Sequence, residues 1–159
     1  YNRENLANAN LSSADKQVPE LDPTTLDNAY AQSGTDGKIT SVALILDNQI
    51  GFKFLTDKKD GATNYKLEIA DNASFTGAQT IDMVATEDGD EYKAIAYLSY
   101  ADLGKTWYVR VTVDGTAGAT LTYNVDAYMV RMLDEATDGL YYLMCALDQL
   151  KLAVAAYLA

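Results

Sequence analysis

Histidine is absent from this sequence of 159 residues, and there is only one cysteine, Cys145. Without an imidazole, Ser-His-Asp triads, Cys-His pairs and histidine-ligated metal sites are excluded. Any catalysis would have to use carboxylates, lysine, tyrosine or the one thiol. A single cysteine also excludes an internal disulfide. Its apolar neighbours, Tyr142 to Leu147, predict that the thiol is buried and unreactive.

Cationic residues are scarce: 12 Lys and Arg stand against 23 Asp and Glu, for a net charge of −11. Such a surface repels nucleic-acid phosphates and anionic lipid headgroups, so we expect neither as a partner. No run approaches 18 apolar residues, so the sequence predicts no membrane span. There is no signal-peptide pattern, and the first residue is Tyr1, so we expect a mature form, an excised module or part of a longer chain.

Proline occurs only twice, at Pro19 and Pro23, and both lie in the polar first segment. We interpret residues 1–38 as an N-terminal linker or arm. It has short helical turns, one capped by Ser12 or Ser13 and another by Thr24 or Thr25. The remaining length, in a chain that is 48% apolar, suits one core, so we expect one globular domain with appendages.

Residues 39–126 alternate apolar and polar side chains, which is typical of strands. The clearest strand runs from Thr106 to Val113, with Trp107 in phase with the apolar face and therefore assigned to the core. Asp47–Gln49 predicts a hairpin turn. About seven short strands with regular turn signals predict a mainly β fold. We expect an antiparallel sandwich like those of immunoglobulin or fibronectin type III domains, with an open barrel as the alternative.

Residues 127–159 change to a three- and four-residue spacing, which predicts a short helix and then a long amphipathic helix with Asp138 as its N-cap. We expect this segment to pack on the sandwich, with a contact to another chain as the alternative. The candidate interface residues are Leu140, Leu143, Leu147, Leu150, Val154 and Tyr157.

Acidic clusters in the turns are candidate Ca²⁺ sites, because hard cations prefer several converging oxygens. The main candidate comprises Glu87, Asp88, Asp90 and Glu91; Asp57 with Asp60, and Asp134 and Glu135 with Asp138, are two others. None matches the twelve-residue calcium loop, and turns favour Asp and Gly in any case. We therefore place solvated turns ahead of Ca²⁺ binding and predict no other cofactor. The same clusters on turn tips make a poor carboxylate pair for glycoside hydrolysis.

Tyrosine is abundant, with 12 residues, and exposed tyrosines can stack on sugar rings. Tyr97 and Tyr108 lie opposite the apolar faces of their strands, and Tyr100 follows a strand. These three residues form the candidate aromatic platform for a glycan.

Several stretches, in order, resemble a recurrent C-terminal module of large secreted and surface proteins of anaerobic Gram-positive bacteria of the gut type. They are YNRENLANANL, DGKITSVALILDNQIGFKFLTD, SYADLGKTWYVRVTVDG, LTYNVDAYMVRML and LMCALDQLKLAVAAYLA. Asp148–Lys151 departs from the Tyr-Gly pair usual in that module. The resemblance implies an extracellular location on the bacterial cell surface, within a multidomain protein. It implies no established activity, so it assigns no catalytic residue.

Three functions remain open, and an enzyme is a distant fourth. The first is a non-catalytic structural or interaction module, a spacer or adhesion unit, whose partners are other domains of the same surface protein. The second is a carbohydrate-binding module. The third is a self-assembling filament or array subunit, because writing residue 159 before residue 1 gives LAVAAYLAYNRENLANAN, which is similar to a continuous motif of the module. In that arrangement the N-terminal arm would join a neighbour's C-terminal helix.

Overall fold

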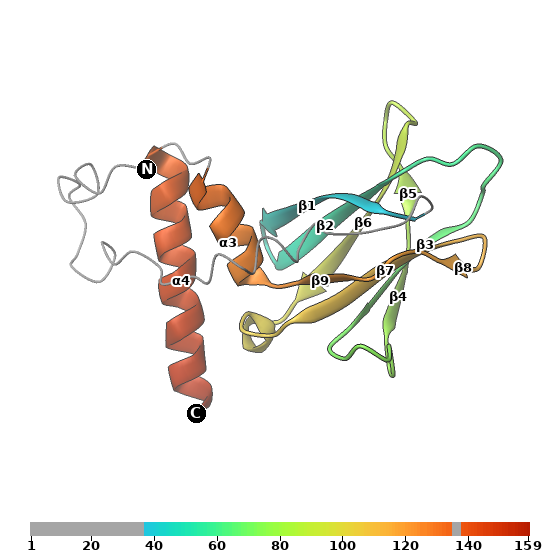
Figure 1. Ribbon diagram of the computed structural model, residues 1–159. Helices are drawn as coiled ribbons and strands as arrows, with labels where there is room; N and C mark the ends of the chain where they lie inside the picture. The colour runs from blue at the N-terminus through green and yellow to red at the C-terminus, as the bar shows by residue number, and fades with distance from the viewer. Residues whose placement is uncertain (1–36, 135–137) are drawn as a thin grey trace.

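Strands and helices follow one another as the spacing predicts in the computed structural model, which describes residues 37–134 and 138–159 (Figure 1). The helical turns and the arm expected in residues 1–36 lie outside the described residues. The strands are β1 (Ile39–Leu46), β2 (Ile50–Asp57), β3 (Tyr65–Ala70), β4 (Gln79–Asp82), β5 (Val84–Ala85), β6 (Glu91–Leu98), β7 (Trp107–Val113), β8 (Thr116–Ala117) and β9 (Leu121–Tyr123). The helices are the short 3-10 helix η1 (Tyr100–Asp102), α3 (Val125–Asp134) and α4 (Asp138–Leu158).

Two antiparallel sheets form the sandwich, as predicted. The first has the order β1-β2-β6-β5, and the second has the order β4-β3-β7, continued by β8 and β9, which both pair with β7. Strands β1, β2 and β6 of the first sheet therefore face strands β3, β7 and β9 of the second sheet. This is the arrangement of an antiparallel β-sandwich, with β4 and β5 at sheet edges.

The described residues contain more strands than the predicted seven because one stretch is divided between the two sheets and a short strand, β8, follows β7. The residues from Gln79 to Ala85, whose apolar side chains keep one two-residue spacing, pair first with β3 and then with β6. Met83, between the two pairings, is buried and donates its backbone N–H to the Tyr65 carbonyl. The chain thus crosses from one sheet to the other at Met83. The alternation of apolar and polar side chains along the sequence cannot predict such a crossing. The short strand β8 lies between Val113 and Leu121 and pairs with β7, and the N–H of Gly118 directly after it donates to the Val111 carbonyl at 2.8 Å.

The core lies between the sheets and uses the predicted inward residues of the main strands. Phe52 on β2 contacts Tyr123 on β9 edge to face, with ring centroids 5.2 Å apart. At another point Tyr65 on β3 stacks on Tyr92 of β6, at 3.8 Å. Aromatic rings therefore join the two sheets directly. Trp107 is half-buried and packs against this core, as predicted.

Helix α3 begins where Asn124 interrupts the alternation. Its side-chain oxygen accepts a hydrogen bond from the Ala127 N–H at 2.8 Å, which is the geometry of an N-cap. Ala127 and Met129 of α3, with Met144 and Leu147 of α4, are buried in the same cluster as the sandwich core. The helices stand across one end of the sandwich, with α3 between the strands and α4 (Figure 1). Sandwich and helices consequently share one apolar core.

The buried face of α4 differs from the predicted one. Leu147 is buried and Leu140 and Val154 are partly buried, but Leu143, Leu150 and Tyr157 are exposed. Met144, Asp148 and Lys151 take their place on the face toward α3. The helix begins at Asp138, in agreement with the predicted start, and the Asp138 side chain is outside the described residues.

Candidate functional site

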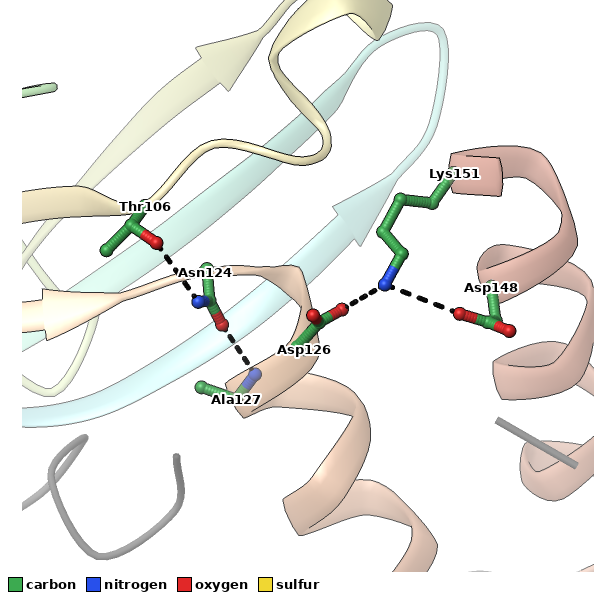
Figure 2. Close-up of polar contacts among 6 residues, drawn as sticks. All are labelled: Thr106, Asn124, Asp126, Ala127, Asp148 and Lys151. Atoms are coloured by element: carbon green, nitrogen blue, oxygen red, sulfur yellow. Dashed lines mark hydrogen bonds and ion pairs between the residues drawn. The ribbon is translucent and has the colours of Figure 1, made fainter. Parts of the chain in front are cut away.

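A polar cluster fixes the two helices to the sandwich at their junction (Figure 2). The Lys151 ammonium of α4 lies 2.5 Å from an Asp126 carboxylate oxygen of α3 and 3.4 Å from an Asp148 carboxylate oxygen one turn earlier. Only 6% of the Asp148 surface is exposed, so this carboxylate depends on Lys151 for its charge partner. Asp126 also lies in the first turn of α3, where the helix dipole stabilises negative charge.

Asn124 extends the polar cluster into the sheet. Besides capping α3, its amide donates to the Thr106 hydroxyl, just before β7, at 3.3 Å (Figure 2). On the opposite sheet, Arg131 of α3 donates to the Val42 carbonyl of β1 at 2.8 Å. Both sheets are therefore tied to α3, and α4 is tied to α3 through Lys151.

Tyr97 lies beside an open pocket at the β1–β2 hairpin. The pocket, of about 190 Å³, is lined by Asp47, Asn48, Gln49 and Tyr97. Tyr97 pairs with Gly51 across β2 and β6, and a Cβ on Gly51 would stand 3.1 Å from the Tyr97 ring carbon Cδ1. The glycine leaves room for the ring, which is 52% exposed. An aromatic face beside carboxylate and amide groups can stack on a sugar ring and bond its hydroxyls.

The other two candidate tyrosines do not join Tyr97 in one platform. Tyr108 is half-buried on the outward face of β7 in the second sheet, whereas Tyr97 is on the outward face of the first. Tyr100 is exposed in η1. The structure therefore leaves one tyrosine with a pocket, and the residues that complete it, Asp47, Asn48 and Gln49, were predicted only as a turn.

The acidic candidate metal loop forms the turn between β5 and β6. Asp88 accepts from the Thr86 hydroxyl at 2.5 Å and from the Asp90 N–H at 3.4 Å, and these bonds lower the pKa of its carboxyl. Gly89 adopts a φ of 78°, which glycine permits. Within residues 37–134 and 138–159, no group of three or more Cys, Asp or Glu side chains is placed to hold a metal ion. Calcium binding by Glu87, Asp88, Asp90 and Glu91 therefore stays a prediction, and the described side chains do not form a ligand cluster that would support it.

The pKa values of the Cys145 thiol and of the paired Asp102 and Lys105 side chains are also shifted. Burial raises the pKa of the Cys145 thiol, and the Asp148 carboxylate raises it further, so the reactive thiolate is suppressed. At the end of η1, hydrogen bonds from Lys105 and Ser99 lower the pKa of the Asp102 carboxyl.

Comparisons with known proteins give no relative: no family model, no curated protein and no solved structure matches the chain. Across the described ranges, none of the helices combines the length and the apolar character that a membrane crossing requires. The function must therefore be argued from the junction, the pocket and the surface of α4.

Proposed function

We propose that this chain is a non-catalytic structural or interaction module, of the spacer or adhesion type, in an extracellular bacterial surface protein. The observation that carries the proposal is the single core shared by the sandwich and its terminal helices, closed by the Lys151 ion pairs. A spacer must hold its two ends in a fixed geometry, and the strands, α3 and α4 all contribute buried residues to this core. The resemblance of its sequence stretches to a surface-protein module supports the extracellular location.

A two-probe unfolding experiment tests the rigid-unit part of the proposal. Trp107 is the one tryptophan and lies in the sandwich, so its fluorescence reports the sheets, while circular dichroism at 222 nm is dominated by the helices. We expect both signals to change with the same midpoint in urea, because one core unfolds in one step. Loss of the helical signal at lower urea than the Trp107 signal would show two independent units and contradict the proposal.

A carbohydrate-binding module is the second candidate, and the Tyr97 pocket supports it. The pocket is small compared with typical ligand sites of 300–1,000 Å³, so it suits one sugar ring of a longer glycan. Asp47, Asn48 and Gln49 offer both donors and acceptors to sugar hydroxyls. Binding would then be weak for a single site and stronger for repeated copies of the module.

Tyr97→Ala tests the glycan site. In affinity gels or glycan arrays with plant and host polysaccharides, we expect this change to weaken binding about ten-fold, the loss of one aromatic stacking contact. Tyr100→Ala is the matched control, because Tyr100 is also exposed but does not line the pocket. Equal losses in the two variants, or binding unchanged in Tyr97→Ala, would remove the pocket as the glycan site.

A further inference from the structure

Helix α4 presents a continuous apolar stripe to solvent, beside the face that packs against α3. Leu143 is 43% exposed, Leu150 38% and Tyr157 88%, and the alanines between them are exposed as well. The stripe consists of Leu143, Ala146, Leu150, Ala153 and Tyr157, at alternating spacings of three and four residues. This spacing is that of a helix-packing seam, and it extends over roughly 21 Å of helix.

The stripe is also uncharged, in a protein whose net charge is −11. From Gly139 to Ala159 the only charged side chains are Asp148 and Lys151, and these are paired on the face toward α3. A helix face kept in water normally carries charged residues on its outer side. Because this face carries none, a second copy of the chain can approach it without bringing like charges together, unlike the acidic turns elsewhere on the surface.

Large and small residues alternate along the stripe in an order that is complementary to the same stripe on a second copy of the chain. When two α4 helices lie antiparallel, Tyr157 of one faces Ala146 of the other, and Leu150 faces Ala153 of the other. Because a twofold axis relates the two helices, Ala146 of the first also faces Tyr157 of the second, and Ala153 of the first faces Leu150 of the second. Each large side chain enters the space over an alanine, so the helices approach closely. In a parallel pair, leucine would face leucine and alanine would face alanine, leaving the small positions unfilled.

We propose that α4 is the interface of an antiparallel homodimer, formed by the part of the stripe from Ala146 to Tyr157. One helix pair is at the small end of specific interfaces, so we expect a dissociation constant of about 1–100 µM. The helix dipoles also favour the antiparallel arrangement. This dimer does not depend on the spacer or glycan proposals, since either function can operate in a monomer.

Sedimentation velocity of the full chain, from about 5 to about 500 µM, tests the dimer. We expect the sedimentation coefficient to rise with concentration and Leu150→Lys to raise the dissociation constant more than ten-fold, because each dimer would bury two ammonium groups against alanines. Leu152→Lys is the matched control: Leu152 is 47% exposed on the same helix but off the stripe. Circular dichroism would verify that both variants keep their fold.

Two outcomes would overturn the dimer. If the wild-type chain sediments as a monomer at every concentration, then residues 1–36 of the same chain or a different partner must cover the stripe. If Leu150→Lys and Leu152→Lys weaken association equally, the stripe is not the contact surface.

Disulfide capture tests the direction of the helices. We expect a mixture of Leu150→Cys and Ala153→Cys chains to form a mixed disulfide faster than either variant alone, because these positions face each other only in the antiparallel pair. Cys145 is buried and does not compete. Faster linking within Leu150→Cys alone would indicate a parallel pair and overturn the proposed arrangement.

Discussion

Phe52→Ala is expected to lower the free energy of unfolding by about 3–5 kcal/mol, the largest effect of any single change considered for this fold. Phe52 has no exposed surface, and its ring contacts Phe54 at 6.1 Å and Tyr123 at 5.2 Å between centroids. The change removes both contacts and leaves a cavity at the point where β2 meets β9 across the sandwich. Urea unfolding followed by Trp107 fluorescence measures the loss as a lower midpoint.

The control for this prediction is Tyr100→Ala, which removes a ring that is 61% exposed. An exposed substitution of this kind normally changes stability by less than about 0.5 kcal/mol. If Phe52→Ala cost as little as Tyr100→Ala, the two sheets would not be held together by the aromatic contacts, and the core described above would be wrong.

Phe52 also illustrates why the sandwich could be predicted from the sequence. Ile50, Phe52 and Phe54 alternate with Gly51 and Lys53, and a strand places alternate residues on opposite faces. The hairpin turn at Asp47–Gln49 follows from the same local pattern. The change of sheet at Met83 depends instead on which strand lies beside each half of the segment. A pattern within one strand contains no information about that neighbour.

The prediction of the buried face of α4 was wrong for a different reason. The helix is apolar almost all round, so two stripes of similar spacing compete: one through Leu143 and Leu150, the other through Met144, Leu147 and Lys151. Lysine side chains are usually exposed, so the spacing gave no reason to place Lys151 on the buried face. Here its stem is buried and its ammonium satisfies two carboxylates, so the charged residues mark the inner face.

The candidate glycan site was partly predictable. Tyr97 was expected to be exposed because it lies opposite the buried residues of its strand, and it is. The pocket needs the hairpin residues as well, and they reach Tyr97 only through the pairing of β2 with β6. That register spans more than 40 residues of chain and depends on tertiary packing, so the polar partners of Tyr97 could not be identified from sequence spacing.

Lys151→Met is expected to lower the free energy of unfolding by about 2–3 kcal/mol. Removing one partner of a fully buried ion pair costs about 3–5 kcal/mol. We expect a smaller loss of about 2–3 kcal/mol here because the Asp126 side chain is 39% exposed and keeps contact with water. Methionine retains most of the apolar stem, so the change isolates the loss of charge. The buried Asp148 then loses the ammonium that pairs with it among the described residues.

A second replacement separates lost charge from lost packing. Adding Asp148→Leu to Lys151→Met removes the stranded carboxylate, and we expect most of the lost stability to return, because a buried ion pair can be replaced by apolar residues at little cost. Lys58→Met, at an exposed lysine of the β2–β3 turn, is the control for a surface charge. If Lys151→Met costs no more than Lys58→Met, the ion pairs do not hold α4 in place. The apolar contacts of Met144 and Leu147 must then fix the helix alone, and the orientation of the solvent-facing stripe would depend on packing rather than on charge.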